Sequence, residues 1–168
     1  MGWTPDDARV LVDGMLAECV TNAAWVKTFT TENGRPPAVR IAGVINKTMD
    51  HLNGNDLTGP LEKAMVDSHE LQVLPAADSL AKRAIREEQD QAAMGLTEGD
   101  VEIGKQVAAD FVITISLGSA LDRQADAIKQ TYTATFRIVD SSTGAMACVA
   151  MPKAARLVNP PATPSPAP

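Results

Sequence analysis

The chain has 168 residues, 45% of them hydrophobic, and carries a formal net charge of -6 at pH 7. This length and apolar content fit one domain with one hydrophobic core. Binding to nucleic acid is not expected, because a phosphate backbone requires clustered cations and the basic residues here alternate with acids. No apolar run of about 18 residues predicts a membrane-spanning helix, and no signal peptide precedes Trp3.

The segment from Thr4 to Phe29 is expected to form one amphipathic helix. Thr4 is a suitable N-cap, and Pro5 suits the first helical position. Apolar residues then recur at spacings of three and four, which predicts one buried stripe along the helix. An Asn-Gly pair at 33–34 and two prolines at 36–37 end the element.

A short, apolar, β-branched run at residues 38–45 predicts an interior strand that is covered on both faces. Residues 46–56 are rich in turn formers and are expected to form a loop, at whose end Asp56 caps a helix with one apolar side. A second strand is expected at residues 70–75, where Pro75 ends it.

Two helices are expected between the second and third strands. A long exposed helix at residues 76–94 is supported by opposite charges four residues apart. A capping box formed by Thr97 and Asp100 opens a shorter helix, which delivers the chain to a strand at residues 110–118.

The last third of the chain has the pattern of an antiparallel meander. Residues 130–140 alternate between apolar and polar, which predicts a half-covered strand. Its apolar face consists of Tyr132, Ala134, Phe136 and Ile138. A turn at 141–144 leads to a final strand at 145–151, which Pro152 is expected to limit.

Together these elements predict an α/β (α+β) sandwich, with a mixed sheet of four to five strands flanked by helices. Two strands joined by a helix start the sheet, and the antiparallel meander ends it. One domain is expected over residues 1–156. The Pro-rich segment 157–168 cannot build a core and is expected to be a disordered tail.

The two cysteines, Cys19 and Cys148, form neither a disulfide framework nor a metal-ligand spacing. Each is expected to be a small, buried apolar residue. One Cys19–Cys148 disulfide stays open as an alternative if the compartment is oxidising.

The sequence contains no pattern that predicts catalysis. Its two histidines, His51 and His69, lack the spacing of a zinc site, and no Gly-rich phosphate loop or nucleophile elbow occurs. The acidic and amide residues around Asp50 and Asp56 miss the register of a calcium loop. We therefore expect no enzyme activity, no metal and no cofactor.

Several motifs, taken in order, carry a family resemblance. They are a Trp-x-x-x-Asp entry at 3–7, WVKTF at 25–29, GRPP at 34–37 with PAVRIAGVINKTMDHLN at 37–53, AIREEQDQ at 84–91, GKQVAADFVITISLGS at 104–119 and YTATFRIVDSSTG at 132–144. With these motifs the chain resembles the LpoB-type outer-membrane lipoproteins, which activate class A penicillin-binding proteins. Ala109-Asp110-Phe111 matches the family's third strand, while Tyr132 and Thr143-Gly144 match its closing hairpin. The resemblance implies a fold like that of the N-terminal domain of TolB.

The resemblance also indicates a candidate partner-binding loop after the first strand. Asn46, Thr48 and His51 match the family's Asn-x-Thr/Ser-x-x-His signature. The expected partner-binding residues are Asn46, Lys47, Thr48, Asp50, His51 and Asn53. The alternative is structural bracing, because Asn and Thr side chains commonly hydrogen-bond to nearby backbone at turns.

The implied function is that of a non-catalytic periplasmic domain that binds and activates a class A penicillin-binding protein, a bifunctional glycosyltransferase–transpeptidase, in peptidoglycan synthesis. The resemblance implies that the natural lipoprotein is anchored to the outer membrane through an N-terminal lipid absent from this chain. The alternative is a structural or assembly subunit of the cell envelope, a CsgG- or TolB-like interaction module that activates no synthase.

Overall fold

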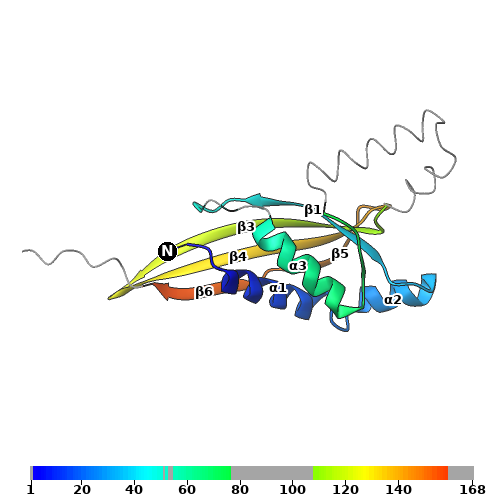
Figure 1. Cartoon of the computed structure of the whole chain (residues 1–168), viewed down its shortest axis with the longest axis horizontal. Helices are drawn as coiled ribbons and strands as arrows, with labels where there is room; N and C mark the ends of the chain where they lie inside the picture. Colours follow the sequence, from blue (N-terminus) through cyan, green and yellow to red (C-terminus); the bar gives the residue numbers. More distant parts are fainter. Residues whose placement is uncertain (1, 51, 53–54, 77–107, 159–168) are drawn as a thin grey trace, which may run out of the picture.

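The computed structural model describes residues 2–50, 52, 55–76 and 108–158. Within these residues, a mixed sheet carries its helices on one face (Figure 1). The elements are α1 (Pro5–Cys19), α2 (Ala24–Asn33), β1 (Ala38–Asn46), α3 (Asn55–Ser68), β2 (Gln72–Val73), β3 (Phe111–Gln124), β4 (Ala127–Asp140), β5 (Met146–Ala150) and β6 (Lys153–Val158). The expected mixed α/β architecture is confirmed.

The strands follow the order β2-β1-β3-β4-β5, and β6 pairs with β4 outside this path. β1 runs parallel to both β2 and β3, whereas β3 and β4 form a long antiparallel hairpin. β5 and β6 pair antiparallel with successive parts of β4. The sheet therefore begins with parallel strands and ends in an antiparallel meander, as the sequence predicts.

The strand expected at 145–151 ends at Ala150, before Pro152, as expected, but the expectation that it is the final strand is wrong, because β6 follows. Pro152 has no N–H to donate, but its carbonyl accepts a hydrogen bond from the Ala134 N–H at 3.1 Å, so pairing along β4 continues. Pro152 thus separates β5 from β6, and both strands pair with β4. β6 reaches Val158, two residues beyond the domain end expected at residue 156.

The expected single helix from Thr4 to Phe29 is also wrong, because a turn at residues 20–22 separates α1 from α2. Asn22 adopts a left-handed backbone with φ 55°, which Asn tolerates better than most residues. The Trp25 indole N–H donates to the Cys19 carbonyl at 2.7 Å and so satisfies a free acceptor at the end of α1. A continuous apolar periodicity does not reveal such a turn.

The core lies between the sheet and the helices α1 and α3. The predicted inner face of β4 is confirmed, since Tyr132, Ala134, Phe136 and Ile138 are each 0% exposed. Helix α1 approaches the sheet edge so closely that a Cβ at Gly14 would lie 2.6 Å from Pro152 Cβ. Gly14 is therefore required by the close contact between α1 and the segment that joins β5 to β6.

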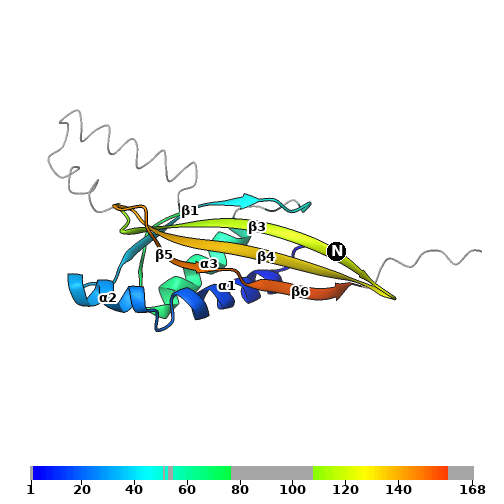
Figure 2. The same ribbon diagram turned by 180° about the vertical axis from the view of Figure 1, so that it is seen from behind.

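The other face of the sheet carries none of the described helices (Figures 1 and 2). β1 is an interior strand, as expected, but its second face is not covered along its whole length, because Ile45 is 62% exposed. The expectation of two covered faces is therefore wrong at this end of β1. A continuous apolar run marks an interior strand without fixing what covers each face.

Some expected elements differ in extent or lie outside the described part of the chain. The expected N-cap Asp56 lies inside the first turn of α3, which begins at Asn55. β3 and β4 continue into a polar hairpin beyond the apolar patterns that predicted them. The helices expected at 76–94 and from Thr97 fall almost wholly outside the described residues.

Cys19 and Cys148 are joined by a disulfide, with their Cα atoms 5.8 Å apart. The expectation of two free cysteines is wrong, and the bridged alternative is correct. The bond links the end of α1 to β5 across a sequence separation of 129 residues. Among the described residues, no helix is both long enough and apolar enough to cross a membrane.

Candidate functional site

The candidate partner-binding loop begins where β1 ends, and we call its described residues 46–50 the β1 loop. The Asn46 carboxamide oxygen accepts hydrogen bonds from the Thr48 N–H at 2.9 Å and from the Thr48 hydroxyl at 2.6 Å. The Thr48 hydroxyl oxygen accepts the Asp50 N–H at 3.1 Å, and the Asn46 amide donates to the Asp50 carbonyl at 2.9 Å. The side chains of Asn46 and Thr48 therefore brace the loop from within, together with the backbone of Asp50.

Two other residues of the β1 loop are turned to solvent. Met49 is 97% exposed, and Lys47 is exposed while its N–H donates to the Leu117 carbonyl at 2.8 Å. Ile45, at the end of β1, is exposed as well. The loop thus presents an apolar, cationic surface on a hydrogen-bonded frame. His51 and Asn53, also expected at this site, lie outside the described residues.

The β1 loop is tied to the core through Asp50. The buried Tyr132 hydroxyl donates a short hydrogen bond to the Asp50 carboxylate and accepts one from the Gln130 amide at 2.9 Å. Burial, and after it the hydrogen bond to Asp50, raises the pKa of the Tyr132 phenol well above its ordinary value. The Trp3 ring packs edge-on against Tyr132, with centroids 5.1 Å apart.

These supporting residues are absent from the sequence-based site. The sequence predicts Tyr132 on the apolar face of its strand and in the family's closing hairpin, and it predicts no role for Gln130. One signal exists, because Gln130 occupies an inward position of the alternating strand and an inward amide needs a buried partner. That partner is Tyr132, two residues away, whereas the link from Tyr132 to the β1 loop depends on a contact with Asp50 over 82 residues.

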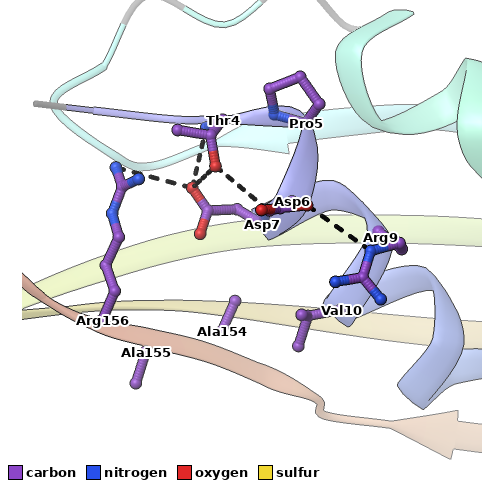
Figure 3. Close-up of a pocket in the computed structure, with 9 residues that line it drawn as sticks. All are labelled: Thr4, Pro5, Asp6, Asp7, Arg9, Val10, Ala154, Ala155 and Arg156. Carbon is purple, nitrogen blue, oxygen red and sulfur yellow. Dashed lines mark hydrogen bonds and ion pairs between the residues drawn. The ribbon is translucent and has the colours of Figure 1, made fainter.

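A hollow of about 610 Å³ lies between the start of α1 and β6 (Figure 3). Its charged groups pair with one another. Asp7 accepts from the Thr4 N–H at 2.8 Å in a capping box and lies 3.7 Å from the Arg156 guanidinium, while Arg9 lies 3.7 Å from Asp6. Figure 3 shows Arg156 and Asp7 facing each other across this hollow.

A much smaller cavity of about 40 Å³ lies behind the β1 loop, between Trp3, Leu52 and Leu117. This volume holds no more than a few waters, whereas pockets for small molecules measure roughly 300–1,000 Å³. Across residues 2–50, 52, 55–76 and 108–158, no group of three or more His, Cys, Asp and Glu side chains could hold a metal ion. The β1 loop is therefore better suited to a macromolecular partner than to a small ligand.

The family-matched Asp110 performs a structural task at the opposite end of the sheet. Its carboxylate accepts hydrogen bonds from the Arg35 guanidinium at 2.7 and 3.1 Å and from the Ala38 N–H at 2.8 Å. The hydrogen bond from Arg35 is the main reason that the pKa of Asp110 lies below its ordinary value. Asp110 thus connects the start of β3 to the start of β1.

Similar solved structures include two LpoB domains and one lipoprotein. The LpoB C-terminal domain from Salmonella enterica is 16% identical, with a TM-score of 0.45, over 89% of this chain and 96% of that chain. The domain from Escherichia coli is 14% identical, with a TM-score of 0.46, over 90% and 98%. Lipoprotein GNA1162 from Neisseria meningitidis is 18% identical, with a TM-score of 0.47, over 73% and 84%.

Sequence comparison assigns the family directly. A search of curated protein sequences gives no match. The family model described as "Peptidoglycan-synthase activator LpoB" matches residues 7–147, which include α1, the β1 loop and the β3–β4 hairpin. Because this match covers most of the 168 residues, the chain belongs to the LpoB family of peptidoglycan-synthase activators.

Proposed function

We propose that this domain binds a class A penicillin-binding protein in the periplasm and raises the rate at which that enzyme polymerises glycan. The observation that carries the proposal is the match to the synthase-activator family over residues 7–147. The domain itself performs no chemistry in this proposal. It acts as a protein ligand of the synthase.

The disulfide supports an envelope location. Disulfides form and persist in oxidising compartments such as the bacterial periplasm and are rare in the cytosol. Because Cys19 and Cys148 are bonded to each other, neither is free to carry a lipid thioether. From the family match we propose that a lipid anchors the natural protein to the outer membrane, and that neither of these two bonded cysteines carries it.

The surface that we propose for docking is the β1 loop with the adjoining Ile45. Methionine is enriched in the cores of protein interfaces, and Met49 is almost fully exposed. Lys47 adds a positive charge beside it, which would steer the loop toward an acidic patch on the synthase. Because the loop is braced from within, docking would order few additional residues.

Activation would follow from a difference in affinity. A ligand shifts an equilibrium only as far as it binds one state better than the other. The domain must therefore bind the active form of the synthase more tightly than the resting form. By reciprocity, a synthase held in its active form would bind the domain more tightly in turn.

The test combines a binding assay with a rate assay. The purified, oxidised domain is immobilised against each class A synthase of the source organism, and glycan polymerisation is then measured with and without the domain. We expect saturable binding and a faster rate at saturation. Absence of binding to every synthase, with no change of rate, would rule out the proposal.

A matched pair of substitutions locates the surface. Met49→Asp should weaken synthase binding at least about tenfold, as expected for a residue at the centre of an interface. Met146→Asp is the control, because Met146 is also exposed, at 62%, but lies on β5 at the opposite end of the sheet. If the two variants bind the synthase equally well, the docking surface does not include Met49 of the β1 loop.

A structural or assembly role remains a second candidate because of one specific feature. Among the described residues, the outer edges of β5 and β6 pair with no further strand, and Met146, Val149 and Met151 are exposed along this edge. Such an apolar edge is a template for strand pairing. Self-assembly predicts a molecular mass that rises with concentration in sedimentation experiments, and a constant monomer mass would exclude it.

A further inference from the structure

A chain of buried and half-buried polar side chains connects the β1 loop to β4, β6 and the start of α1. Its centre is Tyr132, which is 0% exposed and bonds to both Asp50 and Gln130. It is the only tyrosine among the 168 residues. A buried phenol in an apolar core requires partners for its hydroxyl, and here one partner belongs to an otherwise solvent-facing loop.

The inner half of this chain is anchored on regular elements. Gln130 is 8% exposed on β4, and its side-chain carboxamide oxygen lies 3.5 Å from the Arg156 guanidinium of β6. Arg156 in turn lies 3.7 Å from Asp7, which closes the capping box of α1. The hydroxyl of Tyr132 is therefore backed by side chains from elements that the main core already holds in place.

The ring of Tyr132 is fixed as well. Trp3 packs edge-on against it at an interplanar angle of 85°, and the neighbouring Gly2 approaches the carboxylate of Asp50, to which an added Cβ would come within 3.4 Å. Because the ring is fixed, the position of its hydroxyl is fixed as well. The hydrogen bond from this hydroxyl holds the Asp50 carboxylate beside it.

The remaining hydrogen bonds of the β1 loop radiate from Asp50 and Asn46. The Asp50 N–H and carbonyl bond to Thr48 and Asn46, and these two side chains bond to each other. No side chain of this frame holds Met49, whose position follows from the backbone between Thr48 and Asp50, whereas Lys47 is also held by the hydrogen bond from its N–H to the Leu117 carbonyl at 2.8 Å. Moving Asp50 would therefore move Met49.

We propose that Tyr132 is the positioning residue of the β1 loop: its hydroxyl, through Asp50, holds Met49 in the conformation that binds the synthase. This proposal rests on the proposed function and adds the origin of the loop's order. Preorganisation raises affinity by removing the cost of ordering the loop on binding. The consequence is an effect on affinity from a buried residue that contacts no partner.

The central experiment uses Tyr132→Phe, which keeps the ring against Trp3 and removes only the hydroxyl. Synthase binding should weaken about tenfold, the loss expected for one charge-assisted hydrogen bond. At saturating domain, the polymerisation rate should equal that of wild type, because the bound loop presents the same side chains. Amide hydrogen exchange at residues 47–50 should speed up, while exchange in β3 and in the inner part of β4 stays unchanged.

Asp50 provides the test from the other side of the bond. Asp50→Ala should reproduce the Tyr132→Phe result, and combining both substitutions should add little, because they break the same contact. Asp50→Asn keeps an acceptor oxygen for the phenol and should retain most of the affinity. These loop variants leave the core unchanged and so decide the question even if Tyr132→Phe folds poorly.

The outcomes separate this inference from the proposed function. Wild-type affinity in Tyr132→Phe and Asp50→Ala, with binding lost in Met49→Asp, would overturn the positioning role and leave the docking surface in place. Unchanged exchange at residues 47–50 would overturn it as well. Failure of the wild-type domain to bind any synthase would overturn both, whereas hydrogen exchange would still report whether Tyr132 orders the loop.

Discussion

The two ends of the sheet are held together by different chemistry. At the end where β1 and β3 begin, which we call the disulfide end, a covalent bond joins Cys19 to Cys148 and Asp110 binds Arg35. At the other end, which we call the loop end, the chain is held by hydrogen bonds that converge on Tyr132. The disulfide end is held by a covalent bond, whereas the β1 loop at the loop end is joined to the core by the hydrogen bonds of the Tyr132 hydroxyl.

This difference separates stability from binding. A disulfide across 129 residues restricts the unfolded chain strongly but leaves the β1 loop untouched. The hydroxyl of Tyr132 contributes one hydrogen bond to stability, yet it decides where Asp50 lies. Substitutions at the disulfide end should therefore change the free energy of unfolding with little change in synthase binding, whereas substitutions at the loop end should change both.

The largest expected effect comes from breaking the disulfide. Replacing both cysteines with serine should lower the free energy of unfolding by about 4 kcal/mol, because the closed loop is long. Urea unfolding with and without dithiothreitol measures this loss. The double variant itself should be insensitive to dithiothreitol. A loss below about 1 kcal/mol would show that α1 and β5 need no covalent link.

The next effect concerns the contact between α1 and the segment that joins β5 to β6. Gly14→Ala places a Cβ 2.6 Å from Pro152 Cβ and should cost about 2 kcal/mol through overpacking. Pro152→Ala keeps that Cβ and should not relieve the clash, whereas Pro152→Gly should. A double-mutant cycle by urea unfolding tests this, and additive losses in Gly14→Ala/Pro152→Gly would refute the steric explanation.

Tyr132→Phe should lower the free energy of unfolding by about 1.5 kcal/mol near neutral pH, since Asp50 loses its buried donor. The phenol of Tyr132 has a pKa above its ordinary 10.0 in the folded protein. Its contribution to stability is therefore complete below pH 10 and is lost as the pH rises further. Alkaline unfolding of wild type and Tyr132→Phe should converge, and a phenolate that forms below pH 10 in the folded protein would contradict this.

The smallest effect is expected for Asp110→Asn, about 1 kcal/mol near neutral pH, because the amide still offers one acceptor oxygen. The pKa of Asp110 lies below its ordinary 3.8 in the folded protein. Wild type should therefore exceed the variant in stability above pH 3.8 and lose this advantage as the pH falls further. Acid unfolding of both proteins measures the difference, and a constant gap down to full unfolding would contradict the assignment.

Several elements could be predicted from sequence because their signal is local. The alternation in β4 predicts which side chains face the core, and Thr4 with Pro5 predicts the start of α1. The signature residues Asn46 and Thr48 correctly mark a loop. Their hydrogen bonds to each other also agree with the structural alternative, while their part in binding a partner stays a prediction.

Other features could not be predicted because they depend on contacts between distant segments. The turn between α1 and α2 follows from the packing of both helices and from a left-handed Asn22, while the apolar spacing continues through it. β6 forms because β4 offers a free edge beyond Pro152. Neither the turn between α1 and α2 nor the pairing of β6 is determined by residues that are close together in the sequence.

The sequence by itself determines the mixed α/β pattern, the inner face of the long hairpin and the family, because periodicity and motif spacing are local properties. Only the tertiary structure decides that Cys19 meets Cys148 and that Tyr132 meets Asp50. Each pair lies far apart in the chain, and closing such a distance costs entropy that only the complete core repays. The order of the β1 loop therefore depends on the folded protein as a whole.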